Sequence, residues 1–186
     1  MLKTYIQQIN YDGTGYTKGT MVDLEEKFNI VCQEFPFKIN PTPKDLPTRN
    51  WMDEDGLDVY IPEKLPIKEY DIDVTFLYVG EEEYIRSDLS AFIDFLYGRI
   101  PGNNNDTVKT ARLAIYNEYV QLGRKDVVIS EISNELFYVS GNDPDAVAKF
   151  NVKFMVYDPV TNVTPSYQVV NGVRKAVDLL FEDNNI

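Results

Sequence analysis

The stretch YDIDVTFLYV, residues 70–79, alternates apolar and polar side chains with the period of a β-strand that is buried on one face. It leads into SDLSAFIDFLYGR, residues 87–99, where apolar residues recur three and four positions apart and form one stripe on a helix. Further strand-like runs follow at residues 111–120, 126–133 and 150–157. One amphipathic helix among half-buried strands predicts an α+β fold on a mainly antiparallel sheet, either a β-sandwich or a split barrel.

The boundaries of the predicted helix follow from the residues at its ends. Ser87 is suited to the N-cap position, and the carboxylate of Asp88 would lie at the positive end of the helix dipole. Gly98 and Pro101 end the helical pattern. The stripe expected to pack on the sheet consists of Leu89, Phe92, Ile93, Leu96 and Tyr97.

The first 40 residues predict short strands around a glycine-rich turn at residues 12–15. Apolar residues alternate over residues 32–39, but Pro36 lacks the N–H group that a central strand needs. This strand is therefore expected at an edge or an end of the sheet. The sequence GNDP at residues 141–144 predicts a turn before the last strand, which stops at Asp158-Pro159.

Five prolines fall between Pro41 and Pro66, where no clear periodic pattern is present. Long connections of this kind inside a compact domain are often functional or ordered by a partner. We therefore expect an arm at about residues 41–66 that contacts a neighbouring subunit, on a β-rich domain formed by residues 1–159. Residues 160–186 are expected to form a C-terminal tail with a short helix at residues 173–181.

The composition favours a soluble protein that does not wrap around nucleic acid. The 186 residues carry a formal charge of −12, whereas binding to a phosphate backbone requires clustered lysine and arginine. No stretch approaches the roughly 20 apolar residues that span a bilayer, and the opening lacks the apolar core of a signal peptide. The single cysteine, Cys32, cannot form a disulfide within the chain, so we expect folding in a cytosol without membrane attachment.

The residue types that most enzyme sites need are missing. There is no histidine, which excludes Ser-His-Asp triads, Cys-His dyads and zinc sites with a histidine ligand. Cys32 lies in an apolar run and is expected to be a buried structural thiol rather than a nucleophile. Thirty carboxylates make acidic pairs inevitable, so no pair marks a glycosidase site. We expect no enzymatic activity and no catalytic residue.

Two motifs resemble ligand-binding loops only in part. Residues 53–58, DEDGLD, look like a calcium loop, but an EF-hand needs glycine in the sixth position and glutamate in the twelfth. Here Gly56 is fourth and Lys64 is twelfth. The glycines at positions 13, 15 and 19 lack the order of a phosphate loop, and no clear helix follows them. Both stretches are expected to be turns, and we expect no metal-binding or cofactor-binding residue.

From about Trp51 to Pro159 the chain resembles the N-terminal domain of the distal tail proteins of long-tailed bacteriophages. The matching features, in order, are Asp55-Gly56 in the proline-bounded segment, the strand YDIDVTF (70–76), the helix LSAFIDFL (89–96), the strand ARLAIY (111–116) and the strand FNVKF (150–154), which runs into Tyr157-Asp158-Pro159. The first 50 residues match less clearly. This leaves a different tail component, such as a tube or terminator protein, as an alternative.

The resemblance implies a structural protein of the virion tail. Such domains assemble, usually as hexamers, into a ring at the distal end of the tail tube, where the ring is a hub for baseplate or tail-tip assembly. The implied partners are further copies of the chain and tube, tape-measure, tail-tip or fibre proteins, with assembly in the bacterial cytoplasm. A third class, a carbohydrate-binding β-sandwich module, would stack sugars on exposed Trp51 and tyrosines.

Overall fold

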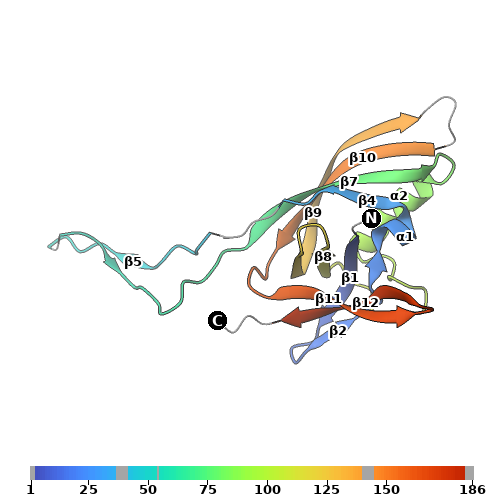
Figure 1. The fold of residues 1–186 in the computed structure, drawn as a ribbon. Coiled ribbons are helices and arrows are strands. Elements are labelled where there is room, and N and C mark those ends of the chain that lie inside the picture. Colours follow the sequence, from blue (N-terminus) through green and yellow to red (C-terminus); the bar gives the residue numbers. More distant parts are fainter. Residues whose placement is uncertain (1–2, 37–41, 54, 140–144, 183–186) are drawn as a thin grey trace.

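The computed structural model describes residues 3–36, 42–53, 55–139 and 145–182 (Figure 1). The helices are α1 (Leu24–Phe28) and α2 (Ile85–Leu96). The strands are β1 (Thr4–Tyr11), β2 (Tyr16–Lys18), β3 (Val22–Asp23), β4 (Ile30–Glu34), β5 (Thr48–Arg49), β6 (Asp58–Val59), β7 (Tyr70–Glu81), β8 (Leu113–Asn117), β9 (Leu122–Val139), β10 (Asp145–Val156), β11 (Asn162–Val170) and β12 (Val173–Glu182).

Most of the strands belong to one antiparallel sheet. Its strand order is β2-β1-β8-β9-β10-β7-β4, and β3 also pairs with β1. The pairing of β7 with β10 runs without a register shift from Tyr70 opposite Val156 to Glu81 opposite Asp145. Within the described ranges the sheet ends at β2 and β4 and does not close into a barrel. The predicted α+β fold on a mainly antiparallel sheet is confirmed.

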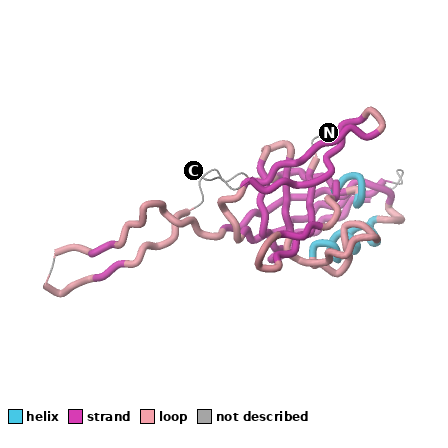
Figure 2. Tube along the Cα trace, turned by 90° about the horizontal axis from the view of Figure 1, so that it is seen from below, coloured by secondary structure: helices cyan, strands magenta, loops and turns pink. Residues whose placement is uncertain are grey.

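The two helices cover one face of the sheet, and Figure 2 shows them close together beside the strands. Phe92 of α2 is fully buried, and its ring centroid lies 5.6 Å from that of Phe28 in α1. The same ring lies 5.7 Å from Phe76 of β7 and 6.1 Å from Phe150 of β10. Because the burial of apolar surface drives folding, this aromatic cluster fixes both helices to two neighbouring strands.

The hairpin of β11 and β12 packs on the opposite face, where β1 and β8 lie side by side. The buried residues of this second cluster are Tyr5, Ile9, Ala114, Tyr116, Val163 and Leu179. Side chains alternate between the faces of a strand. Ile6 therefore packs in the helix-side core while Tyr5 packs under the hairpin.

The predicted short helix at residues 173–181 is wrong, because these residues form strand β12. β12 pairs with β11 from Val173 opposite Val170 to Glu182 opposite Asn162. Asn171 and Gly172 connect the strands with φ angles of 53° and 78°, the left-handed values that both central residues of a type I′ hairpin turn require. An Asn-Gly dipeptide between valines is a strong sequence signal for a two-residue hairpin.

Helix α2 is present, but Ser87 is not its N-cap. Tyr84 holds that position, and the Ser87 hydroxyl donates to the Tyr84 carbonyl oxygen at 2.8 Å. Tyr97 of the predicted stripe is 43% exposed, whereas Phe95, outside that stripe, is fully buried. The buried residues of the helix are Ile85, Phe92, Phe95 and Leu96. Among the described residues, neither helix is long and apolar enough to cross a membrane.

The other strands follow the predicted order with different lengths. β8 is shorter than residues 111–120, and β9 extends beyond residues 126–133 on both sides. β4 lies at the edge of the sheet, as the sequence predicts for the strand next to Pro36. The predicted turn at residues 141–144 lies outside the described residues.

Residues 42–66, which we call the arm, leave the body as a narrow two-stranded ribbon (Figure 1). The isolated bridge between Pro43 and Ile67 fixes its base, and the Lys44 N–H donates to the Pro66 carbonyl oxygen at 2.7 Å. Farther out, β5 pairs with β6. In Figure 1 the arm points away from the end of the body that carries α1 and the β11–β12 turn.

The aromatic cluster predicts a large effect of Phe92→Ala. Because Phe92 is fully buried, removal of its ring should lower the free energy of unfolding by about 3–5 kcal/mol in chemical denaturation. Tyr97→Ala, at the exposed C-cap residue of α2, is the matched control and should cost about 0.5 kcal/mol or less. Equal losses for the two variants would contradict the described packing of α2.

The turn between β11 and β12 predicts that an alanine at position 172 lowers the stability of the protein. A Cβ atom there would meet nothing within 4 Å, so Gly172→Ala tests only the cost of the positive φ angle. We expect a loss of about 1–2 kcal/mol and faster amide exchange in β12. Gly15→Ala serves as control, since it has the same open surroundings without a positive φ. If residues 173–181 formed a helix, Gly172→Ala would leave exchange there unchanged or slower.

Candidate functional site

The arm carries large apolar side chains that the body does not cover. Met52 is fully exposed, and Ile61 and Tyr60 are 73% and 68% exposed. The remaining exposed apolar residues of the arm are Trp51, Leu57, Val59 and Leu65. Single exposed apolar residues are ordinary, but a group of them on one projecting ribbon marks an interaction surface.

The outer part of the arm is also acidic. Between Trp51 and Ile61 the sequence has four carboxylates and no basic residue. Arg49 lies just before this stretch, with its guanidinium carbon 5.7 Å from the ring centroid of Trp51. The arm therefore presents apolar side chains among negative charges. Trp51, the residue considered for sugar stacking, lies on this ribbon rather than on a face of the large sheet.

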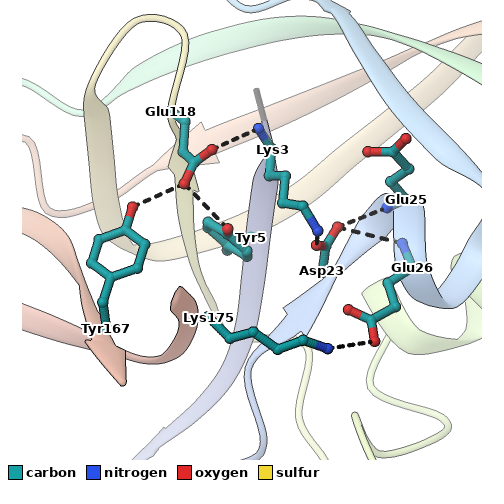
Figure 3. Close-up of polar contacts among 8 residues, drawn as sticks. All are labelled: Lys3, Tyr5, Asp23, Glu25, Glu26, Glu118, Tyr167 and Lys175. Carbon is teal, nitrogen blue, oxygen red and sulfur yellow. Dashed lines mark hydrogen bonds and ion pairs between the residues drawn. The ribbon is translucent and has the colours of Figure 1, made fainter. Parts of the chain in front are cut away.

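A groove of about 910 Å³ opens between the start of β1, the β3–α1 segment and the turn between β11 and β12. We call it the β1–β12 groove, and Figure 3 shows its polar contacts. The cations that line it are Lys3, Lys27, Arg174 and Lys175, and the carboxylates are Asp23, Glu26 and Glu118. Four cations and three carboxylates give the groove an excess of one positive charge, in a chain whose formal charge is −12.

Glu118 gathers three donors on one wall of the groove (Figure 3). Its carboxylate accepts the Lys3 backbone N–H at 3.0 Å and the hydroxyls of Tyr5 and Tyr167 at 3.2 and 2.9 Å. Burial, together with the hydrogen bond to Glu118, raises the pKa of Tyr167 to about 12. The contact ties β11 to β1, so the groove has a fixed wall.

Asp23 organises the opposite wall of the groove. Its side chain caps α1 by accepting the backbone N–H groups of Glu25 and Glu26, and it forms an ion pair with Lys3 (Figure 3). The hydrogen bond to Asp23 raises the pKa of the Lys3 ammonium. Across the groove Lys175 of β12 contacts Glu26 at 3.3 Å. Both of these side chains are at least half exposed, so this pair adds little stability.

Asp158, in the Asp-Pro dipeptide where the last predicted strand stops, stabilises the chain reversal between β10 and β11. Its carboxylate accepts the N–H groups of Val160 and Thr161 at 3.0 and 2.9 Å and the Thr161 hydroxyl at 2.7 Å. The Lys125 ammonium lies 3.3 Å away. Burial opposes ionisation, but these hydrogen bonds and the ammonium hold the pKa of Asp158 below its usual value. The residue is structural.

Cys32 lies on the edge strand β4 and is half-buried. Burial raises the pKa of its thiol to about 11. A thiolate is the reactive form of cysteine, so this environment suits the structural role that the sequence predicts.

The stretches that resemble ligand loops are turns. Asp12 Oδ1 accepts the N–H groups of Thr14 and Gly15 at 2.8 and 3.0 Å, which closes the hairpin between β1 and β2. Gly56, with a φ of 94°, lies in the bend that precedes β6. Within residues 3–36, 42–53, 55–139 and 145–182, no group of three or more cysteine and acidic residues is placed to hold a metal ion.

A second groove, of about 610 Å³, runs along α2. Its floor is formed by Leu89 and Ile93 of the helix with Ile132 and Phe150 of the sheet. The three cations along it are Arg86, Arg99 and Lys149, and the three carboxylates are Glu82, Glu83 and Asp94. It is therefore more apolar than the β1–β12 groove and has no charge preference.

The residues of the β1–β12 groove were not predicted as a site. Lys3, Glu118 and Lys175 are far apart in the sequence and belong to no motif. They meet because β1 pairs with β8 and because β12 folds back over β1. The Asn-Gly turn was the signal that would have brought residues 173–176 to this place.

No protein-family model matches the chain, and no curated protein matches it. Among solved structures the chain is similar to the Dit (gp 19.1) protein of bacteriophage SPP1, with a TM-score of 0.45 and 15% sequence identity. That protein is described as a paradigm of the hub adsorption apparatus in phages that infect Gram-positive bacteria. The match covers 88% of this chain and 58% of that structure, so the chain spans under two thirds of its length.

The contact at Glu118 predicts a measurable change in the pKa of Tyr167. In Glu118→Gln the pKa of Tyr167 should fall from about 12 toward the ordinary value near 10. A raised pKa keeps tyrosine protonated in the folded state, so its contribution to stability is complete below pH 10 and is lost between about pH 10 and 12. The glutamine variant should lose less stability over that interval.

Carbon NMR of labelled tyrosine rings, with Tyr167→Phe for assignment, measures this pKa directly. Tyr78, whose pKa is also raised to about 12 by burial and by Asp88, is an internal control that should not change. An unchanged pKa at Tyr167 would contradict the contact.

Proposed function

We propose that this chain is a structural protein that assembles with copies of itself into a ring at the distal end of a bacteriophage tail tube. The ring would be a hub for baseplate or tail-tip proteins. The observation that carries the proposal is the arm, which projects from the body and exposes an acidic, apolar surface. The chain resembles distal tail proteins in the order of its strand and helix motifs, and this resemblance is the reason for proposing a phage tail.

Ordering a projecting ribbon costs conformational entropy at every residue. The arm recovers little of this cost within its own chain, because its large apolar side chains remain in water. A partner that covers Met52, Tyr60 and Ile61 would supply the missing apolar contacts. In self-assembly each copy of the chain contributes one arm and one surface that can receive the arm of a neighbour.

The position of the arm is compatible with a ring. The arm leaves one end of the body, and α1 and the turn between β11 and β12 lie at the other end (Figure 1). A contact that repeats head-to-tail between such ends closes into a ring when the rotation between subunits allows it. The number six comes from the family resemblance.

The absence of catalysis remains part of the proposal and rests on the sequence, which has no histidine and a single cysteine. The net charge of −12 would suit a ring through which DNA passes without adhering. A tube protein would use the same head-to-tail contacts but would form open filaments. Electron microscopy of the assembled protein separates the ring from the filament.

The proposal predicts that the arm is required for assembly but not for folding. The bridge between Pro43 and Ile67 places the two ends of the arm side by side, so a short Gly-Ser linker can replace residues 44–66. In light scattering the parent should form a closed oligomer as its concentration rises, whereas the variant should stay monomeric. Its unfolding midpoint should remain close to that of the parent monomer.

A point variant gives a milder test on the intact chain. Tyr60→Ser with Ile61→Ser removes exposed apolar surface from the arm and should weaken assembly without loss of stability. Val169→Ser, at an equally exposed valine of β11, is the matched control. A parent that is monomeric at all concentrations, or an armless variant that assembles like the parent, would refute the proposed self-assembly.

A further inference from the structure

We infer that the β1–β12 groove receives the arm of a second copy of this chain. The inference rests on the proposed self-assembly and adds which surface of the neighbour holds the arm. It follows from the positions, charges and dimensions of the two surfaces.

The two surfaces lie where head-to-tail assembly needs them. The arm leaves one end of the body, and the groove lies at the end formed by α1 and the start of β12 (Figure 1). An arm therefore cannot reach the groove of its own chain. Translation and rotation of one copy bring its arm to the groove of the next, and the same contact then repeats around a closed ring.

The charges of the two surfaces are complementary. The stretch from Trp51 to Ile61 has four carboxylates and no basic residue, whereas four cations and three carboxylates line the groove. Arg174 and Lys175 are exposed at the start of β12, where they line the groove. For a chain with a charge of −12 most pairs of surfaces repel, so this pairing is selective.

The dimensions and the apolar parts also fit. A volume of about 910 Å³ lies at the upper end of the range of pockets that bury small-molecule ligands, so it has room for side chains of the arm. Met21, which is half-buried, and Val173, which is exposed, supply apolar surface in the groove. They offer contacts for Trp51 and Leu57, which are 47% and 61% exposed in the single chain.

The groove along α2 is the competing acceptor. Its apolar floor would also cover arm side chains, but its equal numbers of cations and carboxylates give no attraction for an acidic ribbon. Charge complementarity therefore selects the β1–β12 groove, and the experiment includes both positions.

Disulfide trapping between two different single-cysteine proteins tests the assignment. In a Cys32→Ser background one protein carries Leu57→Cys on the arm and the other carries Val173→Cys at the groove. A disulfide needs Cα atoms within about 7 Å, so mild oxidation of the mixture should join the two proteins. A third protein with Ser90→Cys places a thiol at the α2 groove and should cross-link to the arm at least about tenfold less.

A charge exchange tests the same contact without cysteines. Lys175→Glu should weaken assembly roughly tenfold, through one lost attraction and one added repulsion. Asp58→Lys in the same chain should restore it, because the signs are then exchanged. Lys109→Glu makes the same charge change at an exposed lysine outside the groove and should leave the assembly constant within about twofold.

The outcomes separate this inference from the proposed function. Suppose that assembly requires the arm but that Leu57→Cys forms a disulfide with Ser90→Cys, or with neither partner cysteine. This result would overturn the groove assignment and leave the proposed self-assembly intact. A parent chain that never assembles overturns both. Trapping at Val173→Cys together with rescue by Asp58→Lys supports the inference.

Discussion

The alternation of side chains along β1 is the constraint on which both layers of the molecule depend. Gln8 points to the helix side, where its amide donates to the carbonyl oxygens of Phe95, in the last turn of α2, and of Ile100, just beyond the helix. Gln7 points to the other side, where it donates to Asp178 and accepts the Leu179 N–H of β12. A register shift of one residue would exchange these contacts and bury each amide without its partners. The strand therefore positions α2 and the hairpin at once.

The sequence predicted the parts of this fold that are periodic over a long stretch. Residues 70–79 and the helix that follows have clear periods, and both elements are present with altered ends. Residues 173–181, expected as a short helix, form β12 because the Asn171-Gly172 turn pairs them with β11. Helix α1 is too short to leave a periodic pattern and depends on the cap at Asp23. The groove could not be predicted, since its walls come from segments that only the strand order brings together.

The arm and the groove give a physical account of how an acidic protein can associate with itself. Like charges spread over a surface oppose assembly, so the contact must combine apolar burial with a local reversal of charge. The arm supplies the apolar side chains and the negative charge, and the groove supplies the cations. The charged side chains proposed to meet, on the arm and at the start of β12, lie outside the buried core, so their replacement should alter assembly more than stability.

The location of β1 between β8 and the hairpin has a consequence for biosynthesis. The first strand to leave the ribosome pairs with residues 113–117 and contacts residues near position 179, so it must wait for almost the whole chain. Contacts between such distant residues slow folding, because loop-closure entropy is lost before they form. Until then the apolar side chains of β1 remain in water beside an uncovered sheet edge. The nascent chain would be a natural client for chaperones until β12 has been synthesised.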